Sequence, residues 1–104
     1  MKGLGDLMKK AQQMKAGMEK IQQELATREI EAGAGGGMVT VTVTGAQEVT
    51  GIVIDPSVID PGDREMLQDL VQAAVNEALR KSREMMAEEM AKVTGGLPVP
   101  GGLF

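Results

Sequence analysis

The residues whose type and spacing best suit ligand binding are lysines near the amino terminus. Lys2, Lys9 and Lys20 fall within about 20° of one another when residues are placed at about 100° intervals, as in a helix. Lys10 and Lys15 flank the neighbouring apolar stripe. Positive side chains spaced along a rigid helix can neutralise the phosphates of duplex DNA, with little sequence preference. The alternative is an ordinary solvated helix face.

A second basic group, Arg80, Lys81 and Arg83, lies in a later predicted helix and is also a candidate for phosphate contact. Glu77 and Glu84 stand three and four residues from Arg80, at the spacing of local ion pairs. The stem of Lys81 falls at the edge of an apolar stripe, where it could simply pack. DNA contact and these local roles both remain open for this group.

The charge of the chain is unevenly distributed along the sequence. The formal net charge is −4. Residues 1–28 carry six basic and three acidic side chains, for +3, and residues 80–104 carry four and three, for +1. Residues 29–79 carry one basic and nine acidic side chains, for −8. Any contact with nucleic acid is therefore expected at the ends of the chain, not in its middle.

Several kinds of chemistry are disfavoured by the composition. Cysteine and histidine are absent, which argues against disulfides, thiolate chemistry and zinc or haem sites. Ser57 and Ser82 are the only serines, and neither has an evident activating base. Asp55, Asp60 and Asp63 match no calcium loop, and helix capping accounts for them better than a metal does. We expect no enzyme activity, no catalytic residue, no metal and no cofactor.

A glycine-rich stretch, "AGAGGGMVTVTVTG" at residues 32–45, invites comparison with phosphate-binding loops. A Walker-type loop needs a lysine, a serine or threonine and then a helix, and a dinucleotide fingerprint also opens a helix. Here the glycines are followed by Met38 and a strand pattern. The stretch therefore predicts a chain reversal in which glycine supplies positive φ values.

The elements that position these residues can be predicted from periodicity. Apolar residues from Leu4 to Leu25 recur at alternating intervals of three and four, which predicts an amphipathic helix with a basic face opposite its packing face. Residues 27–34, 38–44 and 49–54 predict three strands with short connections, hence an antiparallel meander. The valine face of the middle strand should pack against the helices.

A long second helix is predicted to follow two acidic caps. Asp55 and Asp60 each precede a proline, which suits a helical turn at 56–59 and a helix start near 61–63. The helix should end at "TGG", before a flexible tail at 95–104 rich in glycine and proline. Residues 1–94 then form one α+β domain.

Exposed apolar side chains would make such a monomer unfavourable. The second helix is longer than the sheet, and its projecting part would expose Met85, Met86 and Met90. These methionines suit a core or a dimer seam, with an adaptable partner-binding surface as the alternative. We therefore expect a homodimer. No apolar run reaches the roughly 20 residues that cross a bilayer, and no signal-peptide core is visible, so we expect a cytoplasmic protein without membrane contact.

The order of elements and several short sequence segments resemble the YbaB/EbfC family of bacterial nucleoid-associated DNA-binding proteins. The segments are "MKKAQQMKAGMEKIQQEL", "VTVTVTG" followed by "GIVIDPSVID", "LVQAAVNEALRKSREMM" and "GGLPVPGG". The resemblance implies a tweezers-like homodimer in which two sheets join and long helices project as arms. It also implies a protein of the nucleoid that binds double-stranded DNA and affects chromosome organisation or gene expression.

Site residues are carried over from this resemblance by helix and charge, because the family's basic positions form no tight motif. The DNA-binding candidates are Lys2, Lys9, Lys10, Lys15, Lys20, Arg80, Lys81 and Arg83. The expected dimer interface comprises Ile30, Val39, Val41, Val43, Met85 and Met86. Aromatic platforms, zinc-finger spacing and a helix-turn-helix pair are all missing from the sequence, so sequence preference should be weak and no small-molecule substrate is expected.

A scaffold dimer, which meets DNA only through the replication or recombination machinery, is the alternative hypothesis. Its best support is the net charge of −4.

Overall fold

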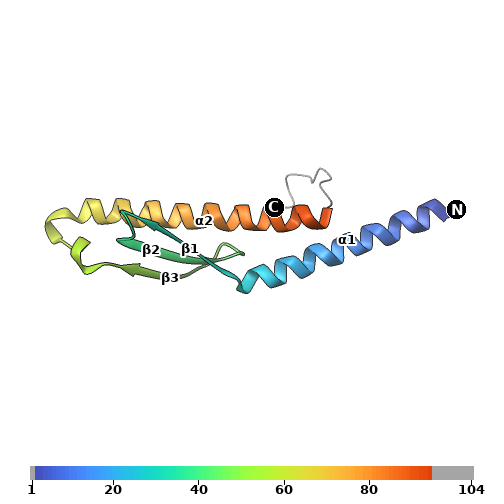
Figure 1. The fold of residues 1–104 in the computed structure, drawn as a ribbon, viewed down its shortest axis with the longest axis horizontal. Coiled ribbons are helices and arrows are strands. Elements are labelled where there is room, and N and C mark those ends of the chain that lie inside the picture. Colours follow the sequence, from blue (N-terminus) through green and yellow to red (C-terminus); the bar gives the residue numbers. More distant parts are fainter. Residues whose placement is uncertain (1, 95–104) are drawn as a thin grey trace.

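The computed structural model describes residues 2–94 as a helix, a three-stranded sheet and a second helix (Figure 1). The elements are α1 (Lys2–Thr27), β1 (Glu29–Ala34), β2 (Val39–Thr44), β3 (Val49–Ile54), 3-10 turns at Pro56–Val58 and Pro61–Asp63, and α2 (Arg64–Thr94). The predicted α+β order is confirmed. The tail predicted at 95–104 lies outside the described residues.

The sheet is an antiparallel meander in the order β1-β2-β3. Between β1 and β2 the chain reverses through Gly35, Gly36 and Gly37, whose φ angles are 64°, 69° and 92°. These are left-handed conformations that glycine adopts without steric cost. The glycine-rich stretch is therefore a turn, as predicted from its sequence.

Element boundaries differ slightly from the predicted ones. The first helix continues to Thr27, so β1 begins at Glu29, two residues later than expected. The Thr27 hydroxyl donates to the carbonyl of Glu24 at 3.2 Å within the last turn of α1. Before α2, the carboxylates of Asp55 and Asp60 accept hydrogen bonds from backbone N–H groups at 2.8 and 2.9 Å. Both predicted caps are confirmed.

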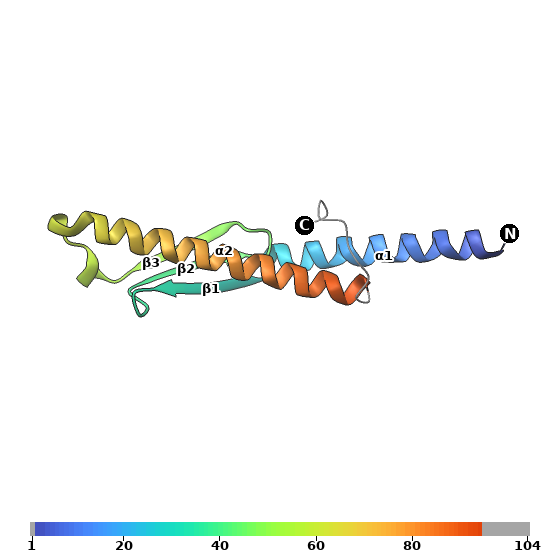
Figure 2. The same ribbon diagram turned by 90° about the horizontal axis from the view of Figure 1, so that it is seen from above.

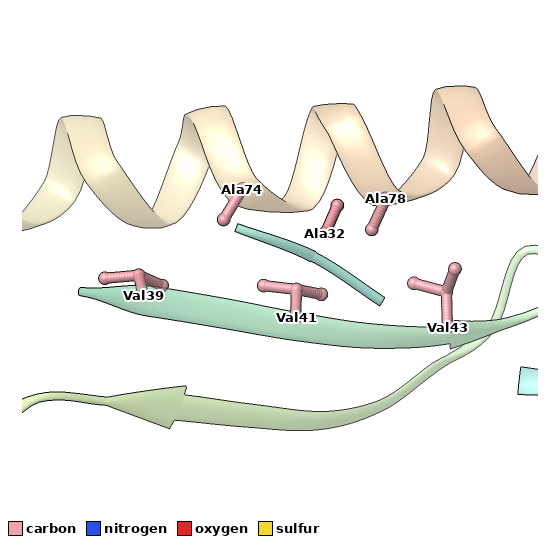
Figure 3. Close-up of a cluster of buried hydrophobic side chains, with 6 residues drawn as sticks. All are labelled: Ala32, Val39, Val41, Val43, Ala74 and Ala78. Atoms are coloured by element: carbon pink, nitrogen blue, oxygen red, sulfur yellow. The ribbon is translucent and has the colours of Figure 1, made fainter. Parts of the chain in front are cut away.

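The core lies between α2 and one face of the sheet (Figure 3). Val39, Val41 and Val43 point from β2 toward α2 and are completely buried. Ala74 and Ala78 meet them from α2, and these small side chains let the helix lie close to the strands. The valine face therefore packs against a helix, as the alternation with threonine predicts.

This packing corrects part of the expected dimer interface. Because Val39, Val41 and Val43 have no exposed surface in a single chain, their side chains are core residues and cannot also contact a second copy. Met85 is 8% exposed and is likewise buried within the chain. Ile30 and Met86 keep part of their surface.

The exposure expected for the far half of α2 is also wrong. Met90 is fully buried, because the second half of α2 does not project alone: it packs against α1. The part that extends furthest is the first half of α1, which runs past the end of α2 (Figure 2). No helix within residues 2–94 is both long and apolar enough to span a bilayer.

Candidate nucleic-acid interface

The first half of α1 forms an arm, here defined as residues 3–16, at one end of an elongated molecule. The principal extents are 73 × 21 × 17 Å. Leu4, Leu7 and Met8 are 57%, 64% and 58% exposed, although Leu4 and Leu7 belong to the apolar stripe that the heptad spacing predicts. The stripe continues into a shallow apolar groove of about 390 Å³ lined by Ala11, Met14, Lys15, Met18, Glu19 and Gln22. The arm therefore has an exposed apolar side.

Contacts at two places along α1 help to attach it to the rest of the chain. At its carboxyl end, the N–H of Gly45 donates to the carbonyl oxygens of Leu25 at 2.8 Å and Arg28 at 3.0 Å, and Leu25 is only 3% exposed. Further along, α1 lies so close to α2 that a Cβ atom at Gly17 would stand 3.1 Å from Cγ1 of Val93. These contacts help to hold the direction of the arm.

The basic side chains of α1 are available to an anionic ligand. Lys2 begins the helix, and Lys9, Lys10, Lys15 and Lys20 are all exposed. The ion pairs formed among the described residues lie elsewhere, so they do not engage these four lysines. Because the lysines project from one continuous helix, their spacing is set by its rigid geometry.

Two of the basic candidates on α2, unlike the exposed lysines of α1, are engaged in interactions within the chain. The Arg80 guanidinium forms ion pairs with both Glu77 and Glu84, and its Nε donates to Oε2 of Glu77 at 3.0 Å. The hydrogen bond from Arg80 lowers the pKa of Glu77, and the same bond and the two carboxylates raise the pKa of Arg80. Lys81 is half-buried, and its Nζ donates a hydrogen bond to the carbonyl oxygen of Glu31 at 3.4 Å. The local roles considered for these two residues are therefore present.

Arg83 is the exception among the α2 candidates. It is exposed, and none of the ion pairs among the described residues includes it. The structure thus brings the four exposed lysines of α1 together on one helix but divides the α2 group, in which Arg83 alone has neither of the local roles of its neighbours.

The acidic part of the sequence forms the sheet and the first half of α2, away from the arm. A shallow groove of about 380 Å³ there is lined by Asp63, Glu65, Met66, Asp69 and Leu70. Within the described part of the chain, no three potential ligands gather in a way that could hold a metal ion. Carboxylates repel phosphates over roughly the 8 Å Debye length at physiological salt. The electrostatics therefore favour the arm, and not the acidic part, as the place where a polyanion would bind.

An apolar surface on β3 was missed by the sequence prediction. Val49, Ile52 and Val53 are 42%, 47% and 70% exposed. Ile52 pairs with Val41 and so lies on the same face of the sheet, but α2 covers β1 and β2 and leaves β3 open. A sequence signal for this surface exists: "VTGIVI" has apolar residues on both faces of the last strand of the meander, which lies at the edge of the sheet.

The fold and the arm define a small α+β protein whose first helix carries exposed lysines. The chain belongs to the YbaB/EbfC DNA-binding family, which it matches over residues 1–97. This family is named for a binding activity, not for a catalysed reaction.

Individual relatives carry a similar description. A protein from Alkaliphilus metalliredigens (strain QYMF), named "Nucleoid-associated protein", is 54% identical over 98 residues, which cover 94% of this chain and 86% of the relative. Another so named, from Moorella thermoacetica (strain ATCC 39073 / JCM 9320), is 52% identical over 102 residues, covering 95% and 98%. The crystal structure of the uncharacterized protein HP0035 from Helicobacter pylori superposes with a TM-score of 0.63 at 25% identity, covering 72% of this chain and 87% of that one.

Proposed function

We propose that this chain is a nucleoid-associated protein that binds double-stranded DNA as a homodimer, through the basic face of α1, with weak sequence preference. The observation that carries the proposal is the set of exposed lysines on α1, Lys9, Lys10, Lys15 and Lys20, which take part in none of the ion pairs formed among the described residues. Membership of a DNA-binding family and the names of the relatives support it. Arg83 is the best placed of the α2 residues to add a further contact.

The chemistry of α1 favours contact with the DNA backbone over base reading. Lys9 and Lys20 are separated by eleven residues on one helix face, or about 16 Å, which lets them reach different phosphates. Lysine presents a point charge on a flexible stem and carries no pattern that distinguishes one base from another. Each phosphate it neutralises releases a counterion, so affinity should depend steeply on salt and little on sequence.

The proposed dimer would use β3 instead of the buried valines. β3 pairs with β2 on one side only, so its other edge can pair with a second strand. Its exposed Val49, Ile52 and Val53 would then be covered by the partner. Ile30 and Met86, which remain partly exposed, are retained as candidate contacts of the dimer. Two arms per assembly would double the number of phosphates that can be neutralised.

The test is to measure DNA affinity against salt concentration for a Lys9→Ala, Lys10→Ala, Lys20→Ala variant. Each phosphate that is no longer neutralised should reduce the slope of log K against log salt by about 0.9, so removal of three lysines per chain should reduce it by up to about 2.7 for each arm bound. A matched control, Arg28→Ala, Arg64→Ala, Lys92→Ala, removes the same formal charge from outside α1, at two residues that are paired with Glu89 and one in the acidic part of the chain. It should leave the slope nearly unchanged. Equal slopes for all three proteins would refute the role of α1.

The scaffold alternative is favoured by the acidic body, which could meet a basic protein partner. Co-purification from nuclease-treated lysate separates the two functions. A partner that stays bound after the DNA is removed, together with a flat salt dependence of DNA affinity, would support the scaffold.

A further inference from the structure

Three glycines occur in α1, and only one of them is in a tight contact. Glycine is, apart from proline, the least favourable residue in a helix interior. A Cβ atom at Gly3 or Gly5 would meet nothing within 4 Å. At Gly17 a Cβ atom would stand 3.1 Å from Cγ1 and 3.7 Å from Cγ2 of Val93. Gly17 therefore marks a point where α1 and α2 approach each other closely.

We propose that Gly17 is a positioning residue that sets the separation between the arm and the carboxyl end of α2, and through it the place where the lysines of α1 meet DNA. The consequence for DNA rests on the proposed function. The separation between the helices is independent of the proposed function, because it follows from packing alone. Distances between packed helix axes vary over about 2 Å with the side chains at the contact.

The geometry of α1 magnifies a change at this point. Leu25 is held to the sheet through Gly45, and Gly17 lies eight residues before it. Lys9 lies sixteen residues before Leu25, twice as far along the same rigid helix. If α1 turns about Leu25, any shift at Gly17 is doubled at Lys9, and the full range of about 2 Å sets an upper limit of about 4 Å there. A displacement of that size is comparable with the reach of a lysine side chain, so it changes which phosphates the lysines of α1 can contact.

The first measurement concerns the separation and is made without DNA. The chain contains no cysteine, so Asp6→Cys on the arm and Glu88→Cys on α2 give two unique sites for spin labels. Both residues are exposed. Labelled protein is diluted with an excess of unlabelled chain so that the distance within one chain is read. Gly17→Val is the test substitution, because valine branches at Cβ and cannot turn both methyl groups away from Val93.

Gly17→Val should lengthen the distance between the labels, by at most about 5 Å if the shift at Gly17 spans the full packing range. Gly5→Val, which makes the same chemical change at an open position, should leave it unchanged. Val93→Ala added to Gly17→Val should recover part of the shift, and Val93→Ala alone should shorten the distance, which keeps the test valid if Gly17→Val fails to fold. An unchanged distance in Gly17→Val, or no recovery with Val93→Ala, would overturn the assignment.

The second measurement repeats the salt dependence of DNA affinity with the same variants. Gly17→Val should reduce the slope by about 0.9 for each phosphate that the displaced lysines no longer neutralise, and Gly5→Val should not. A moved arm with an unchanged slope would refute the positioning role for DNA, provided that the triple-lysine variant does reduce the slope. If the triple-lysine variant has no effect, the proposed function fails, while the label distances still decide whether Gly17 sets the separation.

Discussion

Replacement of Gly45 by alanine should loosen the joint between α1 and the sheet. The alanine Cβ would lie 2.5 Å from the carbonyl oxygen and 2.7 Å from the Cβ of Leu25. Gly45 is not among the glycines with positive φ, so the backbone itself accepts alanine and the cost is steric. Carbon and oxygen atoms normally approach no closer than about 3.3 Å. The joint must therefore open by about 0.8 Å.

Such an opening weakens the attachment of α1. The hydrogen bond from the Gly45 N–H to Leu25, now 2.8 Å, would lengthen to about 3.6 Å, beyond hydrogen-bonding distance. The N–H keeps its second acceptor, the carbonyl of Arg28 at 3.0 Å, so loss of the Leu25 bond alone costs about 1 kcal/mol, and overpacking at the joint adds about 1–3 kcal/mol. The side chain of Leu25, 3% exposed, would pack less closely as well. The free energy of unfolding should fall by about 2–4 kcal/mol, and the midpoint of thermal unfolding by on the order of 10 °C.

The assay is urea and thermal unfolding followed by circular dichroism. Protein concentration must be held constant, because dimer formation would make stability depend on it. Gly5→Ala is the control: its Cβ meets nothing within 4 Å, and alanine should stabilise the helix by up to about 1 kcal/mol. If Gly45→Ala proved as stable as the unaltered protein within about 0.5 kcal/mol, the reasoning about this joint would be refuted.

Three further predictions concern the core and the α2 ion pairs. Val41→Ala removes two methyl groups from a fully buried site and should lower the free energy of unfolding by about 2–3 kcal/mol in urea titrations. Ser82→Ala removes the hydrogen bond that its hydroxyl donates to the carbonyl of Thr44 at 2.8 Å, and should cost about 1 kcal/mol in the same assay. Arg80→Ala should raise the pKa of Glu77 toward its ordinary 4.5, as followed by side-chain NMR titration. Because folding lowers this pKa, the stabilisation from the pair is complete above the ordinary value and is lost as pH falls through the lowered one, so unaltered and Arg80→Ala proteins should converge in stability in acid.

Local pattern was sufficient for the order of elements and for the turns. The alternation of valine with threonine from Val39 to Thr44 predicts both a strand and its buried face. The run from Gly35 to Gly37 predicts the reversal, because few other residues accept three successive positive φ angles. The spacing of Glu77 and Glu84 about Arg80 predicts the ion pairs that form.

Partners that are distant in the sequence could not be assigned from such patterns. Periodicity marks Met85 and Met90 as apolar positions but does not say which element covers them, and α1 packs on this half of α2. For the same reason the uncovered state of β3 was missed. It depends on α2 lying over β1 and β2, which follows from the crossing of helix and sheet and not from the residues of β3.

The sequence by itself determined the identity of the elements, the separation of basic from acidic segments and the family to which the chain belongs, because each of these depends on residues close together in the chain. Tertiary structure decided which cations stay free and which helix projects. It placed Lys81 beside the carbonyl of Glu31, left the lysines of α1 exposed, and brought α1 against α2 at Gly17 and Val93. The physical reason is that packing joins residues far apart in sequence, and the availability of a charge depends on what packing places beside it.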